Sequence, residues 1–249
     1  MLNEKKNNRV KLYGVIIGLV TAVLQHGIYL LANEIAGWIG IPPFLPKIEA
    51  IDDLIPIVAV FVFPYVWSYL YWAMAPMAVS KCDFRHFLDY LASYLFACLA
   101  GALVLIFAPT YMDRVAEGLY DYSKTDFASK LLRFWYSLDG GERAYNLLPS
   151  FHCINSTISY LGVAGRKEIP KWFRVYSLVI TILIYFSTVF VKQHFVMDVF
   201  AGILIAGVAF WICKKTEAGR VFLPAINFVR KLFKKEKINY DGTIAGKES

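Results

Sequence analysis

Two short segments of this chain carry the side chains best suited to chemistry. The first, residues 149–152 (PSFH), offers the hydroxyl of Ser150 and the imidazole of His152, and the second contains His194 and Asp198. Both segments lie at the edges of long apolar stretches, where ionisable side chains are costly and usually functional. Residues four apart share a helix face, so we expect the carboxylate of Asp198 to orient the ring of His194. Two histidines, one of them oriented by a carboxylate, form a nucleophile and acid/base set suited to phosphoryl transfer.

The composition is that of a membrane protein, with 58% hydrophobic, 16% aromatic and only 18% charged residues. An apolar helix of about 20 residues crosses the hydrocarbon core of a bilayer. We therefore predict an all-α integral membrane protein, a bundle of six transmembrane helices. The expected ranges of these helices are 12–32, 54–76, 87–109, 148–164, 174–192 and 195–213.

The basic residues predict how the six helices are oriented. Of the 26 lysines and arginines, 19 fall on one side of the predicted membrane and seven on the other. By the positive-inside rule, the N- and C-termini then lie in the cytoplasm. The start of the fourth helix and the end of the fifth both face outward, so the two histidine segments are expected to meet in one active site at the outer membrane face.

The same topology predicts how the chain is divided. We expect a basic cytoplasmic N-terminus, a six-span catalytic membrane domain and a basic cytoplasmic tail, at 1–11, 12–213 and 214–249. The outer loop 110–147 is far longer than ordinary connections and is expected to carry part of the site. Within it, residues 125–138 have the apolar spacing of a short helix lying over the site. The tail segment 220–237 is open to two interpretations, an interfacial helix on anionic lipid or a tail that fixes the topology.

The net charge of +7 arises mostly from the tail and is explained by the membrane, so a nucleic-acid partner is not expected. The expected partners are membrane lipids and a phospholipid or polyprenyl-phosphate substrate, while protein partners and the oligomeric state stay open. The four cysteines form no CxxC pair, and neither disulfides nor a metal site is expected. The tyrosines and tryptophans of 65–72 are interpreted as packing and membrane-interface residues, and His26 as an interior hydrogen-bonding residue.

The two segments resemble the second and third signature motifs of the type 2 phosphatidic acid phosphatase superfamily, which includes the lipid phosphate phosphatases. The second motif usually reads Pro-Ser-Gly-His. Phe151 replaces its glycine here, as in the branch that includes inositol-phosphoceramide and sphingomyelin synthases. The third motif usually reads Ser-Arg, five residues, His, three residues, Asp, and is matched by Ser187, His194 and Asp198. The resemblance covers roughly residues 50–213 and implies six spans with the site on the outer face.

The chain also departs from the family pattern. Thr188 stands where the third motif has its arginine, so a phosphate-binding cation is missing at that place. The first motif has no literal match, but the Tyr-x-x-Arg segment from Tyr111 to Arg114 is similar to its reduced form in the synthase-like branch. The resemblance therefore indicates Arg114 as the best candidate for the missing cation, with Lys192 as the second.

The resemblance also implies roles for the matched residues. His194 would attack phosphorus and form a phosphohistidine, with Asp198 holding its ring, and His152 would protonate the leaving lipid alkoxide. The phosphoryl oxygens would be held by a set of polar and charged side chains: Ser150, Arg114, Lys192 and Tyr111.

The sequence thus predicts a metal-independent membrane phosphatase, without cofactor, that hydrolyses a phosphomonoester or diphosphate lipid. Candidate substrates are phosphatidic acid, phosphatidylglycerophosphate and a polyprenyl diphosphate. One alternative is a lipid phosphotransferase, in which a lipid or polyol hydroxyl replaces water on the same site. A further alternative, for which Thr188 is the main support, is a catalytically weakened lipid-binding or lipid-transport protein. The compact chain and its lysine- and asparagine-rich composition favour a bacterial plasma membrane.

Overall fold

Helix α6 (Phe151–Val163) lies at the centre of a bundle of long helices, and nearly all its side chains are buried. The structure is a computed structural model that describes residues 10–119 and 123–245, apart from the side chain of Ala22. Four helices pack directly around α6, namely α3 (Val62–Val79), α4 (Phe84–Phe107), α7 (Lys171–Phe190) and α8 (Val196–Lys215). Helix α1 (Leu12–Ile39) packs outside them, against α3 and α4.

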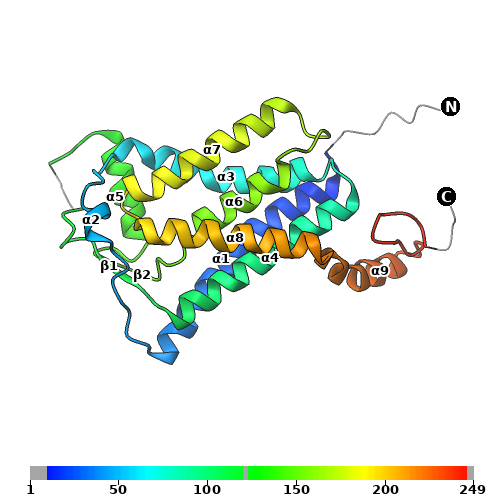
Figure 1. Cartoon of the computed structure of the whole chain (residues 1–249), viewed down its shortest axis with the longest axis horizontal. Helices are drawn as coiled ribbons and strands as arrows, with labels where there is room; N and C mark the ends of the chain where they lie inside the picture. Colours follow the sequence, from blue (N-terminus) through cyan, green and yellow to red (C-terminus); the bar gives the residue numbers. More distant parts are fainter. Residues whose placement is uncertain (1–9, 120–122, 246–249) are drawn as a thin grey trace.

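The shorter elements lie beyond the ends of the long helices. At one end are α2 (Glu49–Asp52), α5 (Phe127–Leu138) and an antiparallel pair of strands, β1 (Tyr111–Asp113) and β2 (Arg143–Tyr145) (Figure 1). The turn η1 (Ala59–Phe61) leads into α3. At the opposite end are the turn η2 (Ala218–Phe222) and the helix α9 (Leu223–Leu232). The long outer loop and the basic tail are therefore at opposite ends of the bundle.

Four of the helices are long and apolar enough to cross a membrane: α1, α4, α7 and α8. Helices α3 and α6 correspond to the second and fourth predicted spans but are not among these four. Because α6 has 13 residues, it is only about 20 Å long, against a hydrocarbon core of about 30 Å. The structure is consistent with a helical membrane protein, and the six spans and the cytoplasmic termini stay predictions.

Two helix boundaries differ clearly from the predicted ones. Helix α1 continues beyond residue 32 to Ile39, because polar residues there interrupt the apolar run but not the helical backbone. It ends where Gly40 adopts a left-handed conformation, with φ at 71°, and its N–H bonds to the carbonyl of Ala36. The second predicted span began at residue 54, but α3 starts only at Val62, after an irregular segment that contains Pro56.

The short helix predicted in the outer loop is confirmed as α5, which begins one residue after Asp126. The side chain of Asp126 accepts a hydrogen bond from the backbone N–H of Ser129 at 3.0 Å and so caps the helix. On α5 the buried side chains Leu132 and Tyr136 pack into a small core under the outer loop. This core also contains Val191 and Phe195, from the turn that carries His194.

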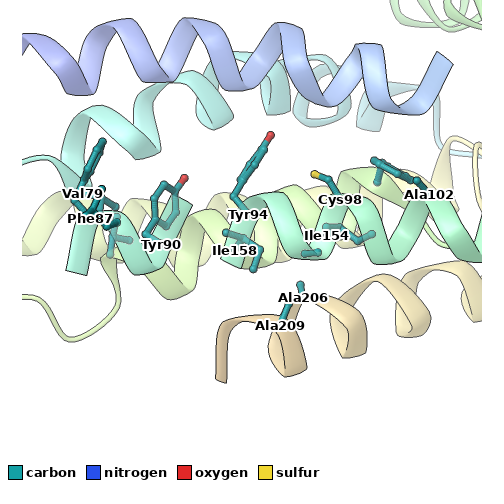
Figure 2. Close-up of a cluster of buried hydrophobic side chains, with 14 of the residues drawn as sticks. Val79, Phe87, Tyr90, Tyr94, Cys98, Ala102, Ile154, Ile158, Ala206 and Ala209 are labelled. Atoms are coloured by element: carbon teal, nitrogen blue, oxygen red, sulfur yellow. The ribbon is translucent and has the colours of Figure 1, made fainter. Parts of the chain in front are cut away.

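One face of α4 supplies the main core. Its buried side chains recur every three or four residues, as expected for a helix with one packed face, and they contact α6 and α8. Figure 2 shows this cluster, with Tyr90, Tyr94 and Cys98 of α4 beside Ile154 and Ile158 of α6. Small residues of α8, Ala206 and Ala209, complete the cluster and allow this helix to approach closely.

Helices α6 and α8 approach each other closely near their N-terminal ends. The backbone N–H of Ser150 donates to the carbonyl of Asp198 at 3.0 Å. A Cβ added at Gly202 would lie 2.7 Å from the Ser150 carbonyl oxygen and 2.9 Å from the Cβ of Cys153. A glycine is therefore required at residue 202 for the two segments that carry the histidines to lie side by side.

We predict that Gly202→Ala lowers the free energy of unfolding by about 1–3 kcal/mol, because the added methyl group must displace backbone. Gly207→Ala is the matched control on the same helix, since a Cβ there meets no described atom within 4 Å. The control is expected to be neutral or slightly stabilising, because alanine favours helix over glycine. Thermal unfolding of both variants in detergent measures the difference, and equal midpoints would contradict the packing argument.

Candidate active site

A cavity of about 320 Å³ lies at the end of the bundle that carries α5 and the two strands. Its walls come from α1, α3, α5, α6 and the turn between α7 and α8. Phenylalanine, tyrosine and tryptophan side chains form a large part of the lining: Tyr29, Tyr65, Tyr69, Trp72, Trp135, Tyr145 and Phe151. Three of the chain's four histidines also line it: His26, His152 and His194. The two predicted histidine segments thus meet in one cavity.

His194 lies in the turn that precedes α8, and Asp198 lies in the first turn of that helix. The Nδ1 atom of His194 is 3.4 Å from Oδ2 of Asp198, while the same carboxylate oxygen accepts a hydrogen bond from the N–H of Phe195 at 2.9 Å. The contact lacks the geometry of a hydrogen bond, and Nδ1 of His194 has no hydrogen-bond partner among the described residues; such contacts are often poorly aligned in sites without substrate. Because Asp198 faces Nδ1, the Nε2 atom of His194 is the ring nitrogen available to a substrate.

His152 is the second residue of α6, and its position is set by the cap of that helix. Oγ of Ser150 accepts from the N–H of Cys153 at 3.4 Å, as expected for an N-cap. The ring of Tyr65 stacks on His152 with centroids 4.1 Å apart. Nε2 of His152 is buried and has no hydrogen-bond partner among the described residues. The centroids of the His152 and His194 rings are 6.2 Å apart.

Both histidines are held at helix N-termini. The N-terminus of a helix carries partial positive charge and favours an anion. Helices α6 and α8 begin at the same place, so their two dipoles act together on the cavity. This is a source of positive potential that needs no basic side chain.

The turn that carries His194 is fixed from one side by Asp52, which is almost fully buried. The carboxylate of Asp52 accepts from the N–H of Val196 at 2.9 Å, and its carbonyl accepts from Nζ of Lys192 at 2.6 Å. Burial lowers the pKa of Lys192, and the nearby carboxylate of Asp52 opposes that effect. Lys192 is therefore directed at the segment around α2.

The same turn is fixed from the other side by Arg114, whose side chain has no exposed surface. One nitrogen of its guanidinium donates to Gln193 Oε1 at 2.7 Å and to Asp139 Oδ2 at 2.8 Å. The other terminal nitrogen of the guanidinium donates to the backbone carbonyls of Tyr136, Asp139 and Gly141. The hydroxyl of Tyr136 in turn donates to the carbonyl of Val191 at 2.6 Å. Arg114 thus joins the end of α5 to the residue beside His194.

The predicted substrate-binding residues do not form one group. Ser150, Arg114 and Lys192 are each at most 8% exposed and are not among the residues that line the cavity in the described part of the chain. Tyr111 lines a separate, shallower pocket beside the strands. Thr188 is buried, and its carbonyl accepts from the backbone N–H groups of Gln193 and His194. Contact of these side chains with substrate stays a prediction.

The cavity differs from the expected phosphate site in its charge. Among the described residues that line it there is neither a lysine nor an arginine. Its polar groups are the three histidines, tyrosine hydroxyls, the side chains of Gln25, Asn146 and Gln193, and the carboxylate of Asp139. The indole N–H of Trp135 is buried without a described partner and is a further donor.

The sequence did not identify the aromatic wall of the cavity. Tyr65, Tyr69 and Trp72 were interpreted as packing and interface residues, but all three line the cavity and contact the ring of His152. Their spacing of four and three residues places them on one face of a helix. This spacing was the feature of the sequence that could have identified them as one group. His26, interpreted as an interior residue, also lines the cavity.

Fold and site together define a helical membrane protein with paired histidines at converging helix N-termini. The chain matches the family model of the PAP2 superfamily over residues 45–212, well over half of its length, and it belongs to that superfamily. The match confirms the resemblance to the type 2 phosphatidic acid phosphatases. Members are generally phosphatases, so membership supports phosphatase or phosphotransferase chemistry on lipid phosphates. No curated protein and no solved structure matches the chain.

We predict that Arg114→Ala lowers the free energy of unfolding by about 3 kcal/mol, because removing a buried cation leaves its acceptors unpaired. Arg143→Ala is the matched control, since that side chain is 64% exposed and pairs with Asp113 at 3.4 Å. Its expected effect is below about 1 kcal/mol. The measurement is thermal unfolding in detergent together with KM. An Arg114→Ala protein that unfolds at the wild-type temperature but has a raised KM would assign Arg114 to the substrate instead.

Proposed function

We propose that this protein is a membrane enzyme that hydrolyses a phosphomonoester or diphosphate lipid through a phosphohistidine on His194. The observation that carries the proposal is the placement of the His152 and His194 rings 6.2 Å apart in one cavity, with Asp198 behind His194. A phosphoryl group between the two rings would have a nucleophile on one side and a proton donor on the other. The proposal places the site at the outer face of a bacterial plasma membrane.

In the first step Nε2 of His194 attacks phosphorus; in a phosphomonoester lipid the bond between phosphorus and the lipid oxygen breaks, and in a diphosphate lipid the bond to the bridging oxygen breaks and a lipid phosphate leaves. His152 gives its proton to the leaving alkoxide, so the lipid alcohol departs neutral. Asp198 stabilises the positive charge that develops on the His194 ring. In the second step His152 takes a proton from water, the water oxygen attacks phosphorus, and the P–N bond breaks to release phosphate. The nucleophile of the first step and the acid and base of both steps are side chains of this protein.

The charge of the phosphate is balanced by groups other than fixed cations. The N-termini of α6 and α8 supply partial positive charge, and the imidazoles add full charge when protonated. The free indole N–H of Trp135 and the tyrosine hydroxyls of the wall are available as neutral donors. Donors of this kind stabilise developing charge best in a site from which water is excluded.

The charge of the cavity favours a second candidate function, transfer of a phospho-headgroup to a lipid or polyol hydroxyl. The donor in that reaction is a phosphodiester, which carries one negative charge, whereas a phosphomonoester carries close to two at neutral pH. A cavity lined by no described lysine or arginine is suited to the lower charge. The two functions share His194 and differ in what attacks the phosphohistidine.

We predict that the purified protein, incubated without metal, releases a product from a panel of lipid phosphates and that His194→Ala abolishes this turnover. The panel includes phosphomonoester, diphosphate and phosphodiester lipids and is tested with and without lipid alcohols, and products are identified by mass spectrometry. Free phosphate identifies a phosphatase, and a new phosphodiester that needs both a phosphodiester donor and the added alcohol identifies a transferase. If His194→Ala retains full function, or if neither protein turns over any lipid, a lipid-binding role replaces both enzyme proposals.

Asp198→Asn is expected to give an intermediate loss of turnover, since it keeps the shape of the side chain but removes its charge.

We also predict that His152→Gln slows release of a lipid alcohol by about 10²–10⁴-fold, the usual contribution of a general acid. The loss is expected to be much smaller for p-nitrophenyl phosphate, whose leaving group departs without protonation. The comparison of kcat for the two substrates in the two proteins is the measurement. Equal losses on both substrates would indicate that His152 binds or positions the phosphate rather than protonating the leaving group.

A further inference from the structure

A second cavity, of about 730 Å³, lies against the first. The two cavities share part of their lining: His26, Tyr29, Leu138, Asp139, Tyr145 and Asn146. The second cavity therefore adjoins the space in which the histidines lie, and these residues form the wall between the two. It extends along the outer half of α1 toward the segment that follows Gly40.

The polarity of the second cavity changes along its length. Polar groups are concentrated at the shared wall, where Asn146 donates to Asn33 at 2.7 Å. Beyond that wall the lining is apolar or has little side chain, as at Leu30, Gly37 and Pro109. A Cβ added at Gly37 would meet no described atom within 4 Å, so the space beside it is open.

The outer half of α1 also exposes apolar side chains beside this cavity. Leu30 is 50% exposed, Leu31 is 59% exposed and Trp38 is 82% exposed. Side chains of this kind on a membrane-crossing helix face hydrocarbon, because water would make their exposure unfavourable. The cavity therefore lies where lipid chains surround the protein.

We propose that the second cavity holds the hydrocarbon chain of the substrate lipid while its phosphate occupies the first cavity between the histidines. This inference rests on the proposed function and adds the place of the lipid chain. The occupant follows from the adjacency of the two cavities and from the order of their linings, polar at the histidines and apolar beyond. That order matches an amphiphile with a phosphate at one end. The substrate then enters sideways from the membrane, between α1 and the segment 138–146.

The test is to fill the cavity with a side chain. Gly37→Leu places a branched chain where the structure has open space, without a steric clash. Gly27→Leu is the matched control on the same helix, because Gly27 also has no described neighbour within 4 Å of an added Cβ but does not line either cavity. Both variants are expected to fold and to insert equally well.

Dioleoyl and dioctanoyl phosphatidic acid are the probes. We expect Gly37→Leu to raise KM for the dioleoyl lipid roughly tenfold, the change expected when about two methylene groups lose their buried environment. Its KM for the dioctanoyl lipid and both values for Gly27→Leu are expected to change less than twofold. Equal behaviour of the two variants on both lipids would overturn the proposal. So would a Gly37→Leu protein that hydrolyses both lipids normally but no longer transfers phosphate to an added lipid alcohol, since that result assigns the cavity to an acceptor.

A second measurement does not depend on turnover. Phosphatidic acid with a diazirine at the chain terminus is photo-crosslinked to the His194→Ala protein, with and without Gly37→Leu. Crosslinks that map to the lining near Leu30, Ile41 or Pro109 and are lost with Gly37→Leu support the proposal. Crosslinks confined to other surfaces, or unchanged by Gly37→Leu, overturn it. Crosslinks in the cavity of a protein that turns over no lipid would preserve the chain site and reject the proposed enzyme function.

Discussion

The site depends on one backbone hydrogen bond, from the N–H of Ser150 to the carbonyl of Asp198. It joins the first turns of α6 and α8, and Gly202 permits the approach because a Cβ there would clash with the Ser150 carbonyl. The two histidines, distant in the sequence, therefore emerge from neighbouring helix ends. Asp198 has two functions in this arrangement, since its carboxylate caps α8 through Phe195 and also faces His194. The residue whose carboxylate caps α8 is thus also the residue that faces the ring of His194.

The loop 110–147 and the segment around α2 complete the site by holding the turn before α8 from two sides. Asp52 holds the turn through Val196 and Lys192, while Arg114 holds it through Gln193. Each of these anchors is buried, so the turn has little freedom to move. The loop is long because it must reach across the end of the bundle and still bury its own small core. Loops of this length are expected to be functional, and here the structural reason is visible.

Much of this architecture could be predicted from the sequence, because it depends on local patterns. The periodicity of apolar residues gave the helices, including α5, and the two motifs gave His152, His194 and Asp198. The sequence could not show which partner a buried cation would have. The groups that accept hydrogen bonds from Arg114 lie at the end of α5, at Gly141 and in the turn before α8. Only the tertiary structure brings these groups together. The aromatic wall was missed for the same reason, since spacing reveals a helix face but not what that face contacts.

The positions of the basic residues have a consequence for how the site binds charge. A guanidinium is protonated at every physiological pH, whereas an imidazole is protonated only below a pKa near neutrality. Arg114 and Lys192 hold the turn that carries His194, and no described lysine or arginine lines the cavity. The side chains of the cavity that can carry positive charge are then its three histidines, which act beside the partial positive charges of the N-termini of α6 and α8. In the proposed mechanism, attack on phosphorus requires a neutral His194, whereas protonation of the leaving group requires a proton on His152. A site built in this way meets both demands only if its histidines differ in environment. The structure gives them different environments, with Asp198 behind His194, aromatic rings around His152, and an exposed position for His26.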